Sequence, residues 1–375
     1  MAQDFIINGK FLRASMTGVH RVAFEICNAL ADLAGEDAPQ LRGRRFEVWH
    51  THTGKETAQT MRLPTREVGP LDGVPWEQLV LPARRGKPIL LNFCNIGPML
   101  SANALTMIHD VQVKLSPGSY SLPFRWWYKI VQSIIARRNL GLLTVSDFSR
   151  NQMAIAGLAP IERIHTIHNG ADHVFRAEAD RDILDRLSIA DETYALALST
   201  VQEHKNIRVL LDAFARPELA EMKLVLFGST GREGFISAGC QVPANVVFAG
   251  RVSDGELRAL IEGAIALAFP STTEGFGLPP LEAMLLGTPA VCAPCGALPE
   301  VCGDAALYAD PDDPEAWAQT IVGLAQDREK HAQAVAAGRA HAATFTWRKA
   351  ALRLLEILDA LEANMPKSQT VALGR

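Results

Sequence analysis

The sequence predicts an α/β protein built from two Rossmann-like, doubly wound domains that face each other across an interdomain cleft. Its 375 residues exceed the roughly 250–300 at which a single hydrophobic core stops growing, so two domains are expected. Short apolar runs alternate with helical patterns along the chain, which is typical of parallel sheets. These runs are nearly continuous, as expected where helices cover both faces of a sheet.

The first half of the chain contains one long helix and several predicted strands. From Val19 to Leu33, apolar residues recur every three or four positions, which predicts a helix with one buried face. Because ligands of doubly wound sheets bind beyond the carboxyl ends of the strands, polar residues that follow a strand are candidates for a site. The predicted strands are residues 4–9, 45–52, 88–93, 105–111, 141–146 and 163–170.

The second half repeats the pattern. Helices are expected over 207–215 and 254–263, and a last long helix follows the final strand. The charged, weakly patterned segment 176–192 is expected to link the two domains. The predicted strands are residues 194–200, 223–228, 245–250, 264–269, 289–293 and 305–310.

The composition excludes several classes of protein. No apolar run of about 18 residues occurs, so no membrane-spanning helix is expected, and the N-terminus MAQDFIING lacks the pattern of a secretory signal. The six cysteines lie mostly in apolar runs, which indicates a reduced, cytosolic protein. Cys292 and Cys295 form one Cys-x-x-Cys, but a zinc site needs a second pair, so no metal is expected.

The net charge of −4 is divided unevenly. Residues 1–174 hold 19 Lys and Arg against 14 Asp and Glu, whereas the remainder holds 18 against 27. A basic first half suits an anionic lipid or a phosphorylated acceptor, and a chance imbalance of surface charge is an equal alternative. The sign of the net charge and the lack of a basic stripe argue against a nucleic-acid partner.

The most informative segment is Pro270–Pro289, PSTTEGFGLPPLEAMLLGTP, which follows an apolar strand. Glu274 precedes a glycine-rich turn, and Glu282 lies in the first turn of a predicted helix that Gly287 would end. A helix start offers free N–H groups to an anion, and ionised carboxylates accept hydrogen bonds from sugar hydroxyls. A diphosphate flanked by two polyols is a nucleotide sugar, which this segment therefore predicts as ligand. The turn consists of Gly275, Phe276, Gly277 and Leu278.

Two other segments would bring a helix start to the same ligand. Lys205 and Asn206 follow the strand 194–200, and a lysine there suits a diphosphate; the alternative is a solvated lysine beside an asparagine N-cap. Gly18 follows Thr17 at the start of the first long helix, where a glycine lets a ligand approach the backbone closely. The alternative there is an ordinary helix cap.

Two further segments leave a functional and a structural interpretation open. His109 and Asp110 end the strand 105–111, where they form either an acid/base or sugar-binding pair, or a structural pair. The segment 124–138, FRWWYKIVQSIIARR, mixes aromatic and basic residues. Such a helix either lies in a membrane interface or is a half-buried domain helix with a basic outer face.

Together these motifs resemble the retaining GT-B glycosyltransferases of family 4 (group 1 glycosyltransferases), and among them bacterial polysaccharide mannosyltransferases. Glu274 and Glu282 have the spacing of the family's donor-site motif. Because matching segments lie along nearly the whole chain, the resemblance implies a GT-B fold for all of it. The other matching segments are 17–21 (TGVHR), 108–110 (IHD), 145–150 (VSDFSR), 168–175 (HNGADHVF), 204–206 (HKN), 248–257 (FAGRVSDGEL) and 298–311 (LPEVCGDAALYADP).

The resemblance implies a role for each candidate residue. Glu282 would hold the ribose hydroxyls, Glu274 a hydroxyl of the donor sugar, and Lys205 the diphosphate. His109 would face the donor sugar, and Gly18 would approach the phosphate. The catalytic set would be Glu274, His109 and Lys205. The other donor-binding residues would be Asn206, Gly228, Gly275, Phe276, Gly277 and Leu278, with Arg251 and Val252 beside the base.

The resemblance also implies how the chain is divided. Residues 1–175 would bind the acceptor and residues 176–345 the nucleotide sugar. Helix 346–363 would cross back to the first domain, and residues 364–375 would form a tail.

The implied chemistry needs no metal ion and no cofactor. Helix dipoles and Lys205 would neutralise the leaving diphosphate. No residue is a candidate nucleophile, and the resemblance implies a same-face displacement in which the leaving phosphate helps to deprotonate the acceptor hydroxyl. Two departures lower the expected positive charge: Ser199–Thr200 replace a Gly-Arg pair, and His204 replaces an arginine. Arg208 or another arginine would have to compensate.

The expected donor is GDP-mannose, with UDP-glucose or another UDP- or dTDP-hexose as the alternative. The expected acceptor is a lipid-linked or polysaccharide chain in the synthesis of exopolysaccharide, O-antigen or lipopolysaccharide. The protein would act in the cytoplasm, with 124–138 as the candidate contact to the inner membrane. Less favoured alternatives are a nucleotide-sugar epimerase or phosphorylase and an inactive sugar-binding homologue, which product formation from a labelled donor would distinguish.

Overall fold

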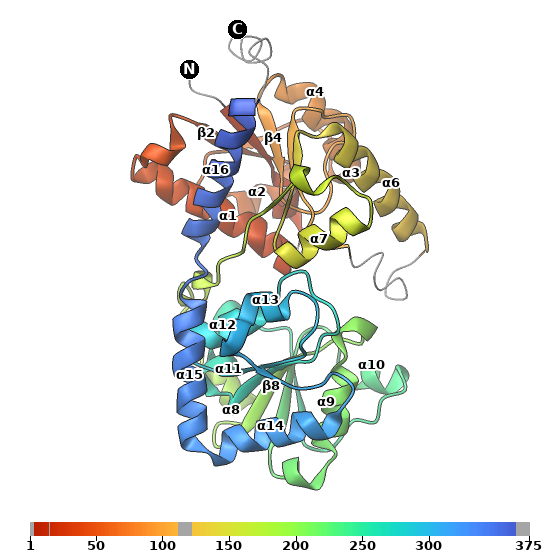
Figure 1. The fold of residues 1–375 in the computed structure, drawn as a ribbon, viewed down its shortest axis with the longest axis vertical. Coiled ribbons are helices and arrows are strands. Elements are labelled where there is room, and N and C mark those ends of the chain that lie inside the picture. Colours follow the sequence, from red (N-terminus) through yellow and green to blue (C-terminus); the bar gives the residue numbers. More distant parts are fainter. Residues whose placement is uncertain (1–3, 15, 112–121, 365–375) are drawn as a thin grey trace. The chain divides into compact units, whose positions relative to one another are not determined.

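The computed structural model describes residues 4–14, 16–111 and 122–364 (Figure 1). The chain divides into two compact units. Unit 1 contains the residues up to Gly170 and again those from Thr346, whereas unit 2 contains Ala171–Phe345. The chain therefore passes between the units twice. Each unit is built on a parallel sheet with helices, so the predicted α/β fold with two doubly wound domains is confirmed.

The sheet of unit 1 has the strand order β3-β2-β1-β4-β5-β6-β7, and neighbouring strands run parallel. The order reverses between β1 and β4, which is where doubly wound sheets leave a crevice for ligands. Six of the seven strands match predicted strands; β3 does not, because its three residues are all exposed and form no apolar run. The strands are β1 (Asp4–Asn8), β2 (Arg45–His50), β3 (Thr65–Glu67), β4 (Ile89–Asn92), β5 (Ala104–Met107), β6 (Gly141–Thr144) and β7 (Ile164–Thr166).

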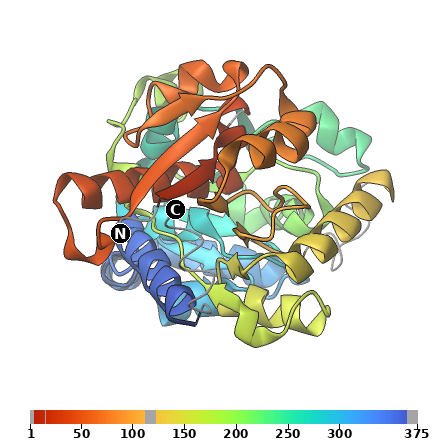
Figure 2. The same ribbon diagram turned by 90° about the horizontal axis from the view of Figure 1, so that it is seen from above.

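The long helix predicted over Val19–Leu33 is α1, and the last helix of the chain, α16, packs against it (Figures 1 and 2). Leu354 and Leu358 of α16 are buried. Unit 1 thus takes part of its core from the end of the sequence. Its helices are α1 (Gly18–Gly35), α2 (Lys55–Ala58), α3 (Gly73–Pro75), α4 (Leu81–Arg85), α6 (Leu122–Arg138), α7 (Asp147–Ile155) and α16 (Trp347–Asn364).

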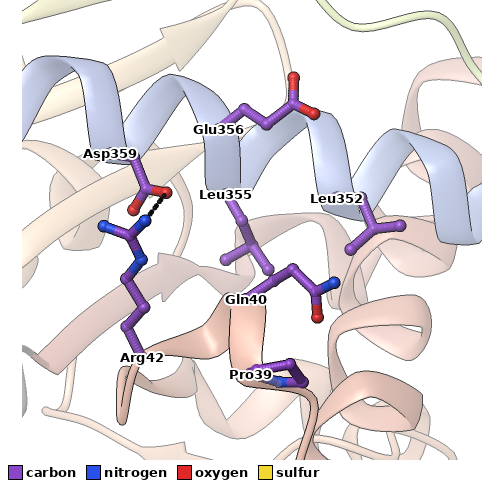
Figure 3. A pocket seen from close by; sticks show the side chains of 7 residues that line it. All are labelled: Pro39, Gln40, Arg42, Leu352, Leu355, Glu356 and Asp359. Atoms are coloured by element: carbon purple, nitrogen blue, oxygen red, sulfur yellow. Dashed lines mark ion pairs between the residues drawn. The ribbon is translucent and has the colours of Figure 1, made fainter.

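Ion pairs fix α16 to the start of β2. The buried Nη2 of Arg44 lies 2.7 Å from Oδ1 of Asp359 and 2.6 Å from Oε2 of Glu362. Arg42 Nη2 lies 3.3 Å from Oδ2 of the same Asp359, at a pocket between α16 and the short 3-10 helix Pro39–Leu41 (Figure 3). The other residues that line this pocket are Pro39, Gln40, Leu352, Leu355 and Glu356.

The sheet of unit 2 has the order β10-β9-β8-β11-β12-β13, again with parallel neighbours, and reverses between β8 and β11. Successive residues of β8 enter different cores: Ala195 packs with α9 and α14, and Leu196 packs with α11. Helices therefore cover both faces, as the continuous apolar runs predict. The strands, all six of them predicted, are β8 (Tyr194–Leu198), β9 (Lys223–Phe227), β10 (Val246–Gly250), β11 (Ala266–Phe269), β12 (Ala290–Cys292) and β13 (Leu307–Tyr308). The helices are α8 (Asp182–Arg186), α9 (Ile207–Phe214), α10 (Arg232–Ser237), α11 (Asp254–Gly263), α12 (Leu278–Leu286), α13 (Leu298–Cys302), α14 (Pro314–Gln326) and α15 (Arg328–Ala342).

Segment 176–192 is part of unit 2 and not the link that its charged composition predicts. Ile183 of α8 and Ile189 are fully buried in the core beside α11. The chain enters unit 2 at Ala171, whose N–H donates to the carbonyl of Phe345, where the chain leaves. The two crossings are thus hydrogen-bonded to each other, and the second unit begins before the charged segment.

Candidate active site

Lys205 and Glu274 meet at the point where the strand order of unit 2 reverses. Lys205 follows β8 and Glu274 follows β11, and these two strands are neighbours in the sheet. Lys205 Nζ lies 2.6 Å from Glu274 Oε1 and 5.8 Å from the ring centroid of Phe269 at the end of β11. Both charged side chains are largely shielded from water. The structure therefore places an ion pair at the reversal point of the sheet, which is where doubly wound folds bind their ligands.

The backbone around Glu274 is held from two sides. Gly296 has φ +62°, and a Cβ there would lie 2.5 Å from the nitrogen of Glu274, so only glycine permits this approach. The N–H of Ala297 donates to the carbonyl of Glu274 at 3.1 Å. On the other side, the N–H of Thr272 donates to the carbonyl of His204 at 2.8 Å, which ties the loop after β11 to the loop after β8. These contacts fix the two charged residues relative to each other.

The predicted glycine turn and helix start are confirmed. Gly277 precedes α12 with φ +99°, and a Cβ there would lie 2.6 Å from Leu298. Prolines stand at the first helical positions, where no N–H is needed, and Gly287 ends the helix in the left-handed region. Since α12 begins at Leu278, Glu282 is its fifth residue and lies just beyond the first turn in which we expected it.

Glu282 has a partner that the sequence analysis did not single out. His173 Nε2 lies 3.1 Å from Glu282 Oε1, and the two side chains are only 8% and 12% exposed. His173 belongs to the short 3-10 helix Asp172–Phe175, directly after the entry into unit 2. His173 lies within segment 168–175, one of the segments that carry the family resemblance, but the residue types in that segment do not predict a contact with α12.

The sequence neighbours of Lys205 make contacts of their own. His204 is buried, and burial, followed by the nearby Lys205 charge, lowers its pKa, so it does not replace the positive charge of an arginine. Arg208 Nη2 donates to the carbonyl of Ala238 at 3.2 Å. Asn206 adopts φ +53° before α9, and its Nδ2 donates to the carbonyl of Pro311 at 2.7 Å, so its side chain does not cap the helix.

The other predicted donor residues of unit 2 follow β9 and β10. Gly228 has φ +142°, a Cβ there would lie 2.7 Å from the carbonyl oxygen of Ser199, and its N–H donates to Gly250. The backbone packing at the strand ends therefore requires glycine at this position. Arg251 is exposed, and Val252 packs against the core beside α11.

In unit 1, His109 follows β5 and is buried. Its Nε2 lies 2.8 Å from the carbonyl oxygen of Phe93, and its backbone N–H donates to Oδ1 of Asn95. Burial lowers the pKa of His109 to about 4. A carbonyl oxygen only accepts, so the neutral ring carries its proton on Nε2 and its lone pair on Nδ1. At neutral pH the ring can therefore accept a hydrogen bond from a hydroxyl through Nδ1, whereas its single proton, on Nε2, is donated to the carbonyl of Phe93.

Gly18 is the first residue of α1 and follows Thr17, the N-cap residue, whose hydroxyl lies 3.1 Å from Nδ1 of His20. Apart from its chain neighbours and the backbone of its own helix, no described atom lies within 4 Å of the position that a Cβ of Gly18 would take. The packing of unit 1 thus does not require glycine here, which leaves the helix start open to approach.

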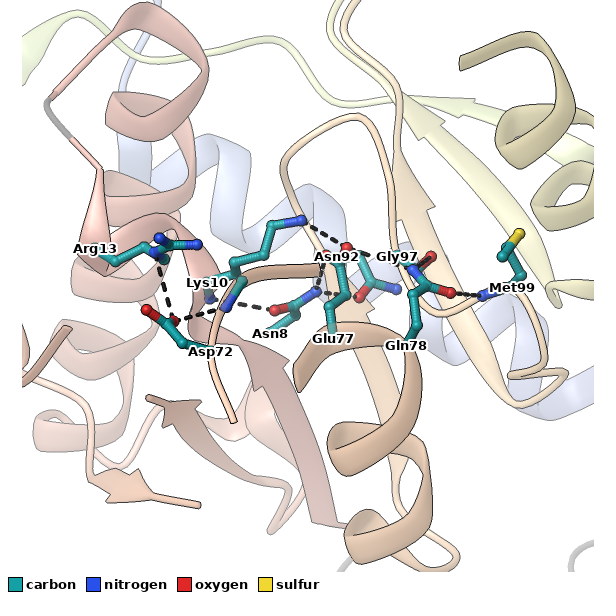
Figure 4. A network of polar contacts seen from close by, with 10 residues as sticks. Asn8, Lys10, Arg13, Asp72, Glu77, Gln78, Asn92, Gly97 and Met99 are labelled. Atoms are coloured by element: carbon teal, nitrogen blue, oxygen red, sulfur yellow. Dashed lines mark hydrogen bonds and ion pairs between the residues drawn. The ribbon is translucent and has the colours of Figure 1, made fainter. Parts of the chain in front are cut away.

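A polar network that the sequence analysis missed lies at the reversal point of unit 1 (Figure 4). The buried Glu77 accepts from Nδ2 of Asn8 at 2.9 Å and from Nζ of Lys10 at 2.6 Å, and Asn8 also donates to Asn92. The next residue, Gln78, donates to the carbonyl of Gly97 and accepts from the N–H of Met99. The network therefore fixes the loop after β4, and this loop supplies the hydrogen-bond partners of His109. The residues of this polar network are too far apart in the sequence to form a recognisable motif.

Helix α6 combines the features of both interpretations of segment 124–138. Val131 and Ile135 are buried in the core of unit 1, whereas Trp126, Trp127 and Ile130 are 63%, 37% and 50% exposed. Lys129 Nζ lies 5.6 Å from the ring centroid of Trp126. The helix is a half-buried domain helix with an aromatic and basic outer face. Of the helices in the described ranges, none has the length and apolar character needed to cross a bilayer.

Residues 180–341 match the family model described as "Glycosyl transferases group 1". The chain is 35% identical over 256 residues to O-antigen chain mannosyltransferase B of Escherichia coli, covering 65% of this chain and 67% of that protein. It is 25% identical over 334 residues to the O-antigen chain mannosyltransferase RfbU of Salmonella typhimurium, covering 86% and 91%. These relatives extend the similarity beyond the segment that the family model matches.

Solved structures agree on the fold. The Anabaena protein HepE, crystallised with UDP and glucose, superposes with a TM-score of 0.71 at 17% identity, covering 96% of this chain and all of that one. WaaG, a glycosyltransferase involved in lipopolysaccharide biosynthesis, gives a TM-score of 0.63 at 14% identity, covering 94% and 98%. At these identities the similarity establishes the GT-B architecture.

Proposed function

Because the chain belongs to the group 1 glycosyltransferases, and is thus a glycosyltransferase, we propose that it transfers a hexose from a nucleotide sugar with retention of configuration and without a metal ion. The acceptor is a lipid-linked or polysaccharide chain in the synthesis of a bacterial surface polysaccharide. The proposal requires Lys205 and Glu274 in one site. The observation that supports it is that Lys205 Nζ lies 2.6 Å from Glu274 Oε1, at the reversal point of the sheet in unit 2.

The arrangement supports a division of the donor among the charged groups. Lys205 and the N–H groups at the start of α12 bind the diphosphate, since an ammonium and a helix N-terminus both stabilise an anion. Glu274 binds a hydroxyl of the transferred sugar, and Glu282 binds the ribose. His109 is neutral with its lone pair on Nδ1, so it is suited to accept a hydrogen bond from a sugar hydroxyl.

The leaving diphosphate carries charge that the site has to stabilise. In the proposed mechanism Lys205 and the dipole of α12 do so, and the leaving phosphate takes the proton of the acceptor hydroxyl as the new glycosidic bond forms on the same face. The lowered pKa of His204 means that this neighbour adds no second positive charge to that of Lys205.

We infer that the donor is GDP-mannose, because two relatives at 35% and 25% identity are named mannosyltransferases. UDP-glucose is the second candidate, because the structurally similar HepE was crystallised with UDP and glucose. The names of the two relatives also favour an O-antigen-like acceptor. The exposed tryptophans and Lys129 of α6 support a contact with an anionic membrane, where such an acceptor would be anchored.

The proposal is tested by incubating the protein with a panel of labelled nucleotide sugars and a lipid-linked oligosaccharide, with Mg²⁺ or with EDTA. We expect transfer from GDP-mannose in both conditions, with an α-linked product by NMR. Thermal shift with each donor identifies the nucleotide independently, since a ligand at 100 times its Kd stabilises by about 2.7 kcal/mol. Unchanged turnover in both Lys205→Ala and Glu274→Ala would overturn the site, and a covalent sugar trapped on a side chain would overturn the mechanism.

A further inference from the structure

His173 adds a residue to the part of the site that the proposed function gives to the ribose of the donor. Its Nε2 lies 3.1 Å from Oε1 of Glu282. We propose that His173 is a positioning residue, which holds the carboxylate of Glu282 in the orientation that accepts hydrogen bonds from the ribose 2′- and 3′-hydroxyls. This inference rests on the proposed function, because it presumes that Glu282 binds the ribose.

The burial of the two side chains explains why Glu282 needs such a partner. A carboxylate that is 12% exposed has lost most of its water, and a hydrogen-bond donor from the protein must replace part of it. His173 supplies an N–H through Nε2, whether its ring is neutral or protonated. A carboxylate has about four acceptor positions, so one N–H on Oε1 leaves room for two hydroxyl groups.

The backbone on either side of His173 is fixed by hydrogen bonds. The chain is fixed just before it by the hydrogen bond from Ala171 to Phe345, and the carbonyl of His173 accepts from the N–H of Arg176 at 3.0 Å. Val174 packs against the core beside α11. A glutamate has three side-chain torsions, and ordering such a side chain costs conformational entropy, so a donor on an anchored backbone segment lowers the cost of presenting Glu282.

A contact that served only to hold the 3-10 helix Asp172–Phe175 against α12 would have different consequences. Its loss would lower the stability of unit 2 and weaken every nucleotide to the same extent. Loss of a positioning contact weakens only those nucleotides whose ribose hydroxyls reach Glu282. Comparing a nucleotide that has the ribose hydroxyls with one that lacks them therefore distinguishes a positioning role from a purely structural one.

The experiment measures the Kd of GDP and UDP, and of their 2′,3′-dideoxy analogues, by calorimetry with the full chain. The variants are His173→Ala, His173→Gln, which keeps an N–H donor, and Glu282→Gln. Arg186→Ala is the control, because it removes an ion pair to Glu256 in the same unit, 2.6 Å long but exposed. The Tm of each variant is recorded alongside, so that unfolded protein is not counted as weak binding.

We expect His173→Ala to weaken the preferred diphosphate about tenfold, in line with the loss of a hydrogen bond to a charged group, and to leave its dideoxy analogue unchanged. His173→Gln should restore most of the affinity, and Arg186→Ala should change neither ligand. An equal loss for both ligands in His173→Ala, beside a selective loss in Glu282→Gln, would refute the positioning role and leave the proposed function intact. If Glu282→Gln itself does not distinguish the two ligands, the ribose assignment in the proposed function fails instead.

Discussion

Lys205 and Glu274 form an ion pair, with Nζ 2.6 Å from Oε1, although the proposed function asks them to bind different parts of the donor. Glu274 thus competes with the diphosphate for Lys205 and also repels it. We therefore predict that Glu274→Gln binds the free nucleoside diphosphate more tightly, by about three- to tenfold, while its turnover falls because the sugar hydroxyl loses its acceptor. Calorimetry with the diphosphate and steady-state kinetics with the donor measure the two effects separately.

The matched control for this prediction is Glu203→Gln, which removes an exposed carboxylate two residues before Lys205. It should change neither quantity, because a surface charge is screened by solvent. Weaker diphosphate binding in Glu274→Gln would mean that Glu274 orients Lys205 for the diphosphate and does not compete with it.

The open space around Gly18 predicts that folding and ligand binding respond differently to an added methyl group. Gly18→Ala should fold normally and gain at most about 1 kcal/mol of stability, since alanine favours a helix over glycine. The KM for the donor should rise about tenfold, because the methyl group keeps the phosphate away from the helix start. Gly35→Ala, at the other end of α1 and equally free of neighbours, is the control and should leave the KM unchanged.

The lowered pKa of His109 predicts how stability depends on pH. Between its ordinary pKa of 6.5 and about 4, the unfolded chain binds a proton that the folded chain does not. The contribution of His109 to the free energy of unfolding is therefore highest above pH 6.5 and falls by up to about 3 kcal/mol as the pH drops toward 4. Urea unfolding at pH 7.0, 5.5 and 4.5 should show this decline in the wild type and a smaller one in His109→Asn. Parallel declines in both proteins would assign the effect to other groups.

The exposed face of α6 predicts binding to anionic membranes. The wild type should sediment with vesicles that contain phosphatidylglycerol and much less with pure phosphatidylcholine, and added salt should weaken the binding. The double change of Trp126→Ala and Trp127→Ala should reduce sedimentation several-fold, since both rings are available to insert. Ile155→Ala removes another exposed apolar side chain of unit 1 and should have no effect. Equal sedimentation of all three proteins would exclude this helix as the contact.

Apolar runs predicted most of the architecture because parallel strands covered on both faces must be apolar throughout. The exception, β3, is exposed along its whole length and leaves no such signal. The prediction that segment 176–192 links the domains was wrong because charged residues dominate its composition. Only a small number of its residues, Ile183 and Ile189 among them, enter the core.

Local motifs predicted the site as far as backbone geometry governs it. The left-handed glycines at 277 and 287 and the prolines between them could be inferred, because few residues tolerate those conformations. The partners of the charged groups could not, since the pairs Lys205–Glu274, His173–Glu282 and Lys10–Glu77 join residues that only the folded sheet brings together. A sequence states which groups are charged but not which of them neutralise one another.

The packing of α16 on α1 has a consequence for the synthesis of the protein. When the ribosome has made residues 1–170, the strands of unit 1 are complete, but the helix that covers α1 is still about half a chain away. Unit 2, made from one continuous stretch, has all its elements before α16 emerges. The first unit to be translated is therefore the last that can finish folding, and a ribosome that stalls before Trp347 leaves an apolar surface exposed to chaperones and proteases.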